Sequence, residues 1–256
     1  MFSRLTWCVA ILAVLCFTLS GIAARLYRIY VMAEPQPRSP DTPVLRVALL
    51  GAASIAPHAL LYPSLTVPEI SVVAVGARDA ARARALAERW AIPTHGSYEQ
   101  VIHSDGIDAV YIALVNGAHY QWAVSALRAG KHVLCEKPLT SNAAEARKLE
   151  KLAADKSLVL MEAYHNLHHP LATRMRELVQ SGELGSLTSI QLSSGLPGPD
   201  GFLPVLRAKL GRPPPAAVPV AEGTPRKAKM DPALGGGKFL GQGCYTISMA
   251  RWLLSA

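Results

Sequence analysis

Residues 44–162 alternate short apolar runs with helix-like segments, and this alternation constrains the fold more than any other feature of the sequence. The apolar runs are rich in β-branched residues and are bounded by turn residues, as buried strands of a parallel sheet are. Strands joined by helices predict an α/β fold with a doubly wound parallel sheet, which binds ligands outside the carboxyl ends of its strands. The expected strands are 44–50, 70–75, 109–114, 132–135 and 158–162, and the expected helices are 79–91, 98–102, 119–129 and 143–155.

The first expected strand ends in the turn GAASIA, residues 51–56. A dinucleotide-binding Rossmann unit has a glycine-rich turn here, because glycine allows a tight bend and a close approach of backbone amides to a pyrophosphate. Only the first glycine position is kept, and alanine occupies the second and third. The turn alone is equally consistent with a plain strand-to-helix connection. Within the repeated strand-helix pattern it predicts cofactor contacts at Gly51, Ala53, Ser54 and Ile55.

The second expected strand ends at residues 76–79, with the sequence Gly-Ala-Arg-Asp. In a Rossmann fold this strand end meets the adenosine ribose, where an acidic side chain binds the 2′-hydroxyl of NAD and a basic one accommodates the 2′-phosphate of NADP. Ala77 stands where the acid is often found, and Arg78 follows it, so NADP is favoured over NAD. The alternative is that Arg78 only begins the solvated face of the helix 79–91.

Charge and cysteine usage argue against several other classes of protein. The chain has 26 basic and 18 acidic residues, but the basic groups are short and lack interleaved aromatic residues, which does not favour nucleic-acid binding. The four cysteines show no CxxC or Cys/His spacing, so neither a disulfide framework nor a zinc site is expected. His165, His168 and His169 lack nearby cysteines or paired carboxylates, and we expect them to be structural rather than metal ligands.

Residues 7–24 form an uncharged apolar run with arginine on both sides. At about 1.5 Å of rise per residue, a helix of this length nearly spans a bilayer core of roughly 30 Å. We expect a membrane anchor rather than a cleaved signal peptide, because the run is longer than a signal-peptide core and the cleavage pair Gly21 and Ala23 is weak. Unpaired cysteines favour a folded domain that faces the cytosol, whereas signal cleavage would place it in the secretory pathway.

Several stretches carry a resemblance that periodicity alone does not show: GAASIAP from residue 51, NGAHYQWAVSALRAGKHVLCEKPL at 116–139, VLMEAYH at 159–165 and SGELG at 181–185. They resemble the Gfo/Idh/MocA oxidoreductases, in particular the branch of dimeric dihydrodiol dehydrogenase and NADP-dependent D-xylose dehydrogenases. The resemblance implies hydride transfer between NADP and a hydroxyl or carbonyl of a sugar, polyol or cyclic diol. It also implies a second, α+β domain and a homodimer.

The same resemblance assigns roles to individual residues. The family's lysine matches Lys137, which would lie beside the nicotinamide and the substrate hydroxyl, and the family's acid/base partner in the second domain matches Tyr245. An ammonium group stabilises a developing alkoxide, and a phenol donates to or accepts from a substrate oxygen. For His119, a solvated position at the start of a helix is an equal alternative. The residues expected along the cofactor side are Leu114, Asn116, His119, Glu136 and Lys137.

The second half departs from the family pattern. Gly241 occupies the place of the family's acidic residue, Asn166 and Leu167 replace an aromatic residue and an arginine, and 198–225 is expected to be a Pro-rich insertion. Only one helix is expected after Tyr245, so the sheet that closes the substrate pocket and forms the family dimer is expected to be largely missing. A cofactor-binding pseudoenzyme or scaffold without turnover is therefore the alternative function. The expected organisation is an anchor or signal segment with a Pro-rich linker at 1–43, a Rossmann domain at 44–162 and a partial substrate and oligomerisation domain at 163–256.

Overall fold

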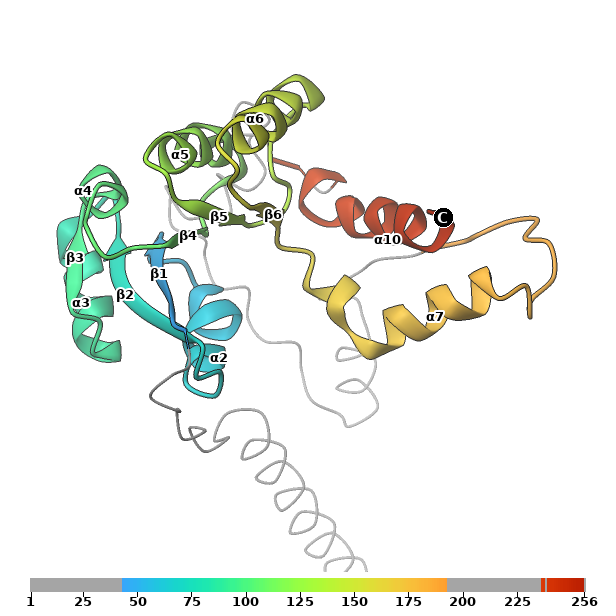
Figure 1. The fold of residues 1–256 in the computed structure, drawn as a ribbon, viewed down its shortest axis with the longest axis horizontal. Helices are drawn as coiled ribbons and strands as arrows, with labels where there is room; N and C mark the ends of the chain where they lie inside the picture. The colour runs from blue at the N-terminus through green and yellow to red at the C-terminus, as the bar shows by residue number, and fades with distance from the viewer. Residues whose placement is uncertain (1–42, 193–235, 238, 256) are drawn as a thin grey trace, which may run out of the picture.

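The computed structural model describes residues 43–192, 236–237 and 239–255. Its first part is a six-stranded sheet in the order β3-β2-β1-β4-β5-β6, and every neighbouring pair of strands is parallel (Figure 1). This confirms the predicted α/β fold with a doubly wound sheet. The strand order reverses between β1 and β4, and in such sheets ligands bind at this point. The strands are β1 (Leu45–Leu50), β2 (Ile70–Gly76), β3 (Thr94–Gly96), β4 (Ala109–Ile112), β5 (His132–Cys135) and β6 (Leu160–Glu162).

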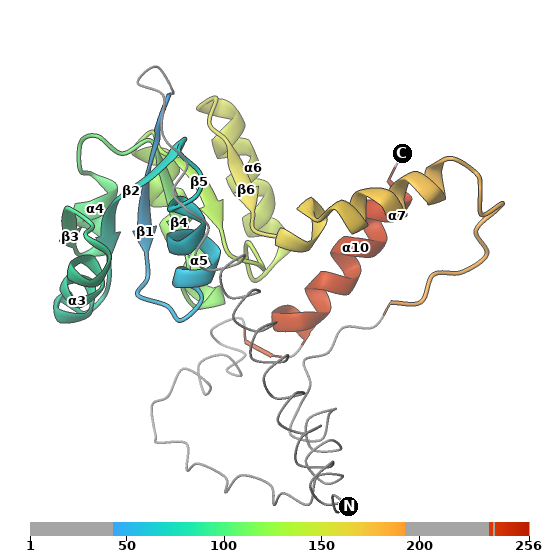
Figure 2. The ribbon, with the colours of Figure 1, turned by 90° about the horizontal axis from the view of Figure 1, so that it is seen from below.

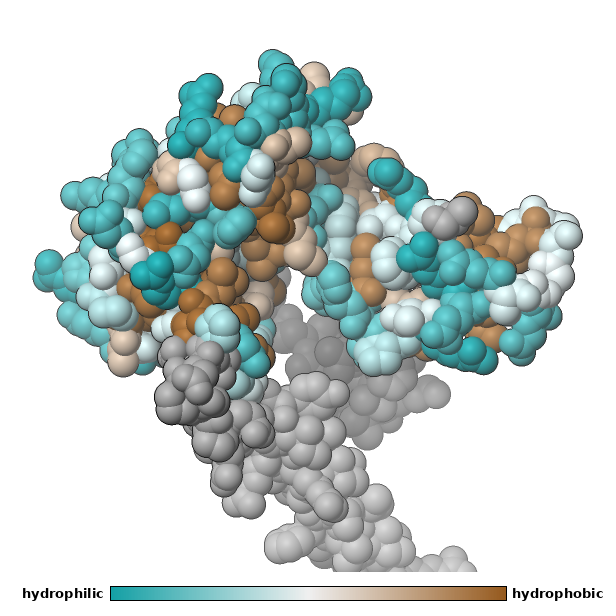
Figure 3. Space-filling view, in the orientation of Figure 1, coloured by the Kyte–Doolittle hydropathy of each residue, from teal (hydrophilic) through white to brown (hydrophobic). Residues whose placement is uncertain are grey.

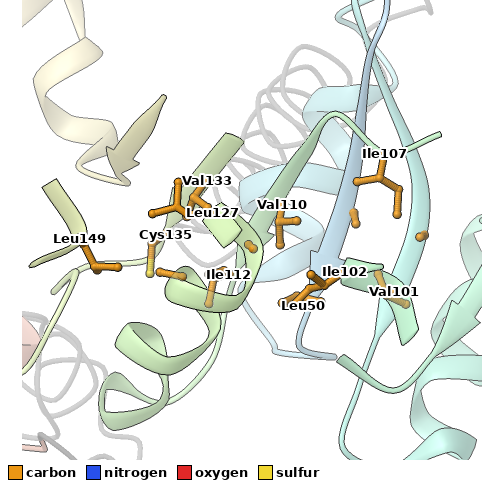
Figure 4. Packing of buried hydrophobic residues seen from close by; sticks show 14 of the residues in the cluster. Leu50, Val101, Ile102, Ile107, Val110, Ile112, Leu127, Val133, Cys135 and Leu149 are labelled. Atoms are coloured by element: carbon orange, nitrogen blue, oxygen red, sulfur yellow. The ribbon is translucent and has the colours of Figure 1, made fainter. Parts of the chain in front are cut away.

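Helices cover both faces of this sheet (Figure 2). They are η1 (Pro57–Leu61), α2 (Tyr62–Ser64), α3 (Ala80–Trp90), α4 (Tyr98–Ile102), α5 (Asn116–Arg128) and α6 (Ala143–Asp155). Successive strand side chains point to opposite faces. On one face Leu50 and Ile112 pack with Leu127 of α5 and Leu149 of α6, as Figure 4 shows. On the other face Leu49 packs with side chains of η1 and α3, so the sheet is buried on both sides.

Side chains at the helix starts explain where these helices begin. The Asn142 side chain caps α6 by accepting a hydrogen bond from the backbone N–H of Glu145. Asp79 accepts one from the N–H of Ala81 at α3. Ser97 and Gln100 form a capping box at α4. Each such cap satisfies an otherwise unpaired helical N–H, and its loss typically costs about 1 kcal/mol.

Several helices and strands begin at residues other than the predicted ones. The helix expected at 119–129 begins earlier, at Asn116, because Val115 is already the extended residue that precedes the first turn. The strand expected at 158–162 begins at Leu160, since the N–H of Val159 bonds to a ring nitrogen of His132. Strand β3 was missed, because three residues are too few to show an alternating pattern; its pairing with β2 creates it. The predictions for 98–102, 132–135 and 143–155 are confirmed from end to end.

All the regular secondary structure described after β6 is helical. It comprises η2 (His165–His168), α7 (Pro170–Gln180), η4 (Phe239–Gly243) and α10 (Cys244–Leu254), and the described residues beyond 162 contain no strand. Helix α7 packs against α10, where the Arg176 guanidinium lies over the Trp252 ring at 4.4 Å from its centre. Large apolar side chains remain exposed on this part of the molecule (Figure 3), among them Leu171, Leu184 and Leu254.

Two segments for which the sequence makes a prediction lie outside the described residues. They are the apolar run 7–24 and the expected insertion at 198–225. Within the part of the chain that is described, no helix has the length and apolar character needed to cross a bilayer.

Candidate active site

The carboxyl edge of the sheet collects the residues for which the sequence predicts a function. Gly51 follows β1, and Arg78 lies two residues beyond β2. Leu114 lies just beyond β4, and Glu136 and Lys137 follow β5. Because all the strands are parallel, these ends lie along one edge. The fold therefore brings together segments that are far apart in the sequence.

Gly51 makes the sharp turn at the end of β1. Its φ of +110° is one that L side chains rarely adopt, and an added Cβ would collide with the carbonyl oxygen of Ala113 and lie 2.9 Å from a methyl group of Leu114. The Gly51 N–H donates to the carbonyl of Gly76 at 2.8 Å. Glycine is thus required here, and it lets the ends of β1, β2 and β4 approach one another.

The turn that follows leads directly into η1. Ser54 and Ile55 are exposed, whereas Ala56 is fully buried against the sheet. The turn is closed by its own backbone, because the N–H of Ala56 donates to the carbonyl of Ala53 and the N–H of His58 donates to that of Ile55. The exposed turn and the glycine cradle before it fit the pyrophosphate of a dinucleotide. The individual contacts of Gly51, Ala53, Ser54 and Ile55 with a cofactor stay predictions.

Two arginines lie near this turn. Arg78 is exposed between the end of β2 and Asp79, which caps α3. Arg82, in the first turn of α3, donates from Nη2 to the carbonyl of Ala52 at 2.8 Å. Sequence analysis missed Arg82; its position four residues after Arg78, at the start of a helix, was the available signal. A guanidinium group that contacts the turn itself makes this end of the site more basic than Arg78 alone would.

Lys137 lies where the two halves of the described chain meet. Its Nζ donates to the carbonyl oxygen of Gly241 at 2.7 Å and lies 4.4 Å from the centre of the Tyr245 ring. The predicted catalytic pair, Lys137 and Tyr245, is therefore in contact, although 104 residues separate Lys137 from Gly241. The lysine ammonium is held by a backbone carbonyl at the position where the sequence resemblance implies an acidic side chain.

The Tyr245 ring is fixed by neighbours other than Lys137. Tyr164 and His165 both pack edge-on against it, with ring centres 5.7 and 5.6 Å away. Burial, together with the negative charge of Glu136, raises the pKa of the Tyr245 phenol to about 12. The phenol is therefore protonated at neutral pH and is a donor to any oxygen that binds beside it.

Glu136 precedes the lysine and is partly buried. Its Oε1 accepts a hydrogen bond from the Tyr111 hydroxyl at 2.7 Å. Burial, reinforced by this hydrogen bond, raises the pKa of Tyr111 well above its ordinary value, so Tyr111 is a permanent donor. Glu136 is thereby oriented at the carboxyl edge, while its predicted contact with a cofactor, like that of Asn116 at the start of α5, stays a prediction.

His119 is completely buried, which makes the solvated alternative for this residue wrong. Its Nδ1 lies 2.7 Å from the carbonyl oxygen of Pro138, and its Nε2 lies 3.1 Å from that of Leu114. Burial lowers the pKa of the ring, against the opposing effect of these two carbonyls. A neutral imidazole has one N–H and donates to one carbonyl at a time. The ring therefore donates either to the carbonyl of Pro138, beyond β5, or to that of Leu114, beyond β4, and its contact with a cofactor stays a prediction.

Glu162 is a residue of this edge that sequence analysis did not select for the site. It ends β6, and its Oε1 accepts a hydrogen bond from the backbone N–H of Leu139 at 2.7 Å. The carboxylate also interacts with the Tyr164 hydroxyl. Burial raises the pKa of Glu162, against the opposing Leu139 hydrogen bond. A lone glutamate at the end of a strand gives no local signal for such a contact.

The histidines near η2 have structural contacts. His165 packs on Tyr245, and the Nδ1 of His169 accepts a hydrogen bond from the N–H of Leu171 at the start of α7. Across the described ranges, no group of three or more histidine, cysteine, aspartate or glutamate side chains is arranged to hold a metal ion.

A parallel sheet in this strand order, with a glycine turn directly after β1, defines a dinucleotide-binding Rossmann protein. Family models narrow this class. Residues 45–164 match the oxidoreductase family with an NAD-binding Rossmann fold, and residues 172–256 match the GFO/IDH/MocA C-terminal domain. The chain belongs to the Gfo/Idh/MocA family, as its sequence motifs predicted.

Individual relatives agree with this assignment. D-xylose 1-dehydrogenase (NADP(+)) 2 of Haloferax volcanii is 37% identical over 207 residues, which cover 80% of this chain and 56% of that protein. Trans-1,2-dihydrobenzene-1,2-diol dehydrogenase of Mus musculus is 37% identical over 56% of this chain and 44% of that protein. The crystal structure of KijD10, a 3-ketoreductase from Actinomadura kijaniata in complex with NADP and TDP-benzene, has a TM-score of 0.67 and 32% identity, and covers 83% of this chain and 57% of that one. The matches thus span only 44–57% of the length of these proteins.

Proposed function

We propose that this chain is an NADP-dependent oxidoreductase that transfers a hydride between nicotinamide and a hydroxyl or carbonyl group of a sugar, polyol or cyclic diol. The observation that carries the proposal is the contact of the Lys137 ammonium with Gly241 and Tyr245 at the carboxyl edge of the sheet. A cation and a protonated phenol side by side are the groups that a developing alkoxide requires. The names of the relatives, which specify NADP and sugar or diol substrates, support the same class.

The chain's residues fit NADP from one end of the cofactor to the other. The turn after Gly51 would hold the pyrophosphate, and Arg78 would pair with the 2′-phosphate, with Arg82 beside it. Leu114, Asn116 and Glu136 would border the path toward Lys137. When bound, the nicotinamide ring supplies or accepts the hydride.

The protein's own part in the reaction is binding and proton transfer. The Lys137 ammonium donates a hydrogen bond to the reacting oxygen and stabilises negative charge on it. Tyr245 gives its phenolic proton to that oxygen in the direction of reduction and takes it back in the direction of oxidation. Burial, which raises the pKa of Tyr245 to about 12, keeps this proton in place until an alkoxide forms.

Lys137→Met tests the assignment. It removes the ammonium and keeps most of the side-chain volume, so kcat/KM should fall by about 10² to 10⁴-fold while the Kd for NADPH changes little. The matched control is Lys148→Met, on the exposed surface of α6. Turnover of the Lys137 variant at the parent rate would remove Lys137 from the mechanism.

The second candidate function is a cofactor-binding protein without turnover. The observation in its favour is Gly241, whose carbonyl holds Lys137 where the family resemblance implies a carboxylate. The relatives named above are all oxidoreductases, which favours the enzyme. A panel of aldoses, polyols and dihydrodiols assayed with NADP and NADPH separates the two, because turnover of any member excludes the scaffold.

We also propose that residues 7–24 anchor the protein in a membrane, with the Rossmann part on the cytosolic side. The support is the uncharged apolar sequence of this segment, whose helix would satisfy its own backbone groups in a bilayer. Alkaline carbonate extraction should leave the full chain in the membrane pellet, and deletion of residues 1–40 should release a protein that still binds NADPH. Recovery of a soluble protein that begins near Ala24 would show signal cleavage instead.

A further inference from the structure

The peptide bond between Pro138 and Leu139 directly follows Lys137, and side chains hold it at both of its polar ends. Its carbonyl oxygen, on Pro138, lies 2.7 Å from Nδ1 of His119. Its N–H, on Leu139, donates to Oε1 of Glu162 at 2.7 Å. The two side chains come from different elements, His119 from α5 and Glu162 from the end of β6.

Such a peptide has little freedom to rotate. Rotation about its flanking bonds would break two short hydrogen bonds, one of them to a carboxylate, and hydrogen bonds to charged groups are the stronger kind. His119 is fully buried, so the packing around its ring keeps Nδ1 directed at the carbonyl of Pro138. The orientation of the backbone just after Lys137 is therefore set by the framework of the sheet.

Glu162 also reaches the other member of the catalytic pair. Its carboxylate interacts with the Tyr164 hydroxyl, and the Tyr164 ring packs edge-on against Tyr245 at 5.7 Å between centres. One side chain thus connects the backbone beside Lys137 with the ring that supports Tyr245.

We propose that Glu162 is a positioning residue for this site: with His119 it holds the Pro138–Leu139 peptide, and through Tyr164 it supports Tyr245, so that Lys137 Nζ and the Tyr245 phenol stay together. The catalytic meaning of this arrangement rests on the proposed function, but the arrangement is measurable without turnover. Glu162 contacts neither reacting atoms nor the cofactor in this assignment, and it acts only through Leu139 and Tyr164.

The test compares Glu162→Met, which keeps the length of the side chain but has no oxygen, with Glu162→Gln, which keeps an acceptor oxygen. The control is Glu150→Met on the exposed surface of α6. Two properties of the full chain are measured: hydrogen exchange of the Leu139 amide, by NMR of protein labelled with ¹⁵N-leucine, and acetylation of Lys137 by N-hydroxysuccinimidyl acetate, followed by mass spectrometry.

In Glu162→Met the Leu139 amide should exchange about tenfold faster, because a hydrogen bond to a charged group is lost. The acetylation rate of Lys137 should change by at least about threefold, because the contact between the Lys137 amine and the Tyr245 ring is no longer maintained. Glu162→Gln should return both values to within about twofold of the parent, and NADPH affinity should be the same in every variant. With an active preparation, kcat should fall in Glu162→Met with KM little changed.

Faster exchange at Leu139 with unchanged acetylation of Lys137 would overturn the proposal, because Glu162 would then only satisfy a backbone amide. Unchanged exchange would overturn it as well. If Glu162→Met does not fold, Glu162→Asp serves in its place, since the shorter side chain keeps the charge but moves its carboxylate away from Leu139. If Lys137 is acetylated at the parental rate in this variant, Glu162 is not a positioning residue. Absence of turnover in the parent chain would contradict the proposed function and leave both of these readouts valid.

Discussion

The two parts of the described chain differ in how completely they are packed. In the Rossmann part, both faces of the sheet are covered, and core side chains such as Leu50, Ile112 and Leu127 are fully buried. In the part after residue 164, only Ala172, Cys244 and Leu253 are buried among the described apolar residues, while Leu171, Leu184 and Leu254 are more than half exposed.

This difference matters for the site, because each part contributes one member of the proposed catalytic pair. Lys137 stands on a strand end that is tied to its neighbours by His119 and Glu162. Tyr245 stands in the first turn of α10 and depends on ring contacts from Tyr164 and His165. The lysine follows a strand of the packed sheet, whereas the tyrosine is positioned by rings from the segment that follows β6.

The largest expected effect lies in the packing itself. Leu127→Ala removes a fully buried side chain of α5 and should destabilise the protein by about 2–5 kcal/mol, through lost transfer energy and the cavity left behind. Leu254→Ala, at a position that is 61% exposed, should cost less than about 0.5 kcal/mol. Urea unfolding followed by circular dichroism measures both, and equal losses would contradict the contrast in packing.

Tyr245→Phe isolates the contribution of the second part to the chemistry. It keeps the ring that packs on Tyr164, His165 and Lys137 but removes the proton donor, so kcat should fall by about 10²-fold or more, with the free energy of unfolding nearly unchanged. Tyr120→Phe, on α5, is the matched control. A Tyr245 variant with the parental kcat would show that the rigid part alone carries the proton transfer.

Arg78→Ala tests the other end of the proposed site, at the carboxyl end of β2 in the Rossmann part. Loss of a charge-assisted contact to a 2′-phosphate should weaken NADPH binding by about ten- to a hundredfold and leave NADH binding unchanged. Arg84→Ala, also exposed on α3, should have no such effect. Cofactor fluorescence titration gives the four affinities, and equal parental affinities for NADH and NADPH would remove Arg78 from this role.

The smallest expected effect concerns an ion pair at the opposite edge of the sheet. Asp108 accepts hydrogen bonds from Arg46, which lowers its pKa from 3.8 to about 2. A carboxylate whose pKa is lowered by folding stabilises the folded state above its ordinary pKa, and this stabilisation is lost as the pH falls toward 2. Asp108→Asn should therefore be slightly less stable than the parent at pH 7, and the difference should vanish near pH 2.

For this pair, Asp105→Asn is the control, because Asp105 is exposed and forms no ion pair among the described residues. Unfolding curves at several pH values should separate the two variants most above about pH 4 and converge as the pH falls toward 2. A constant difference down to pH 2 would mean that Asp108 acts through packing rather than through its charge.

Local signals in the sequence were sufficient for much of the fold. The strand at 132–135, the helix at 143–155 and the cap at Asn142 depend on residues close together in the chain, where alternation and capping chemistry act directly. Gly51 likewise predicted a turn, and the structure shows a backbone conformation there that requires glycine. Family motifs then pointed to Lys137 and Tyr245 as a pair.

Only the tertiary structure decided how these pieces meet. In the folded chain, His119 is buried between two backbone carbonyls, and Arg82 contacts the turn after β1. Glu162 accepts a hydrogen bond from the amide of Leu139, and Lys137 donates one to the carbonyl of Gly241. Each of these contacts joins residues that are not neighbours in the sequence, and each depends on strand order and register. Periodicity reports which face of an element is buried, whereas the partner of a given side chain follows from which strand ends become adjacent when the sheet forms.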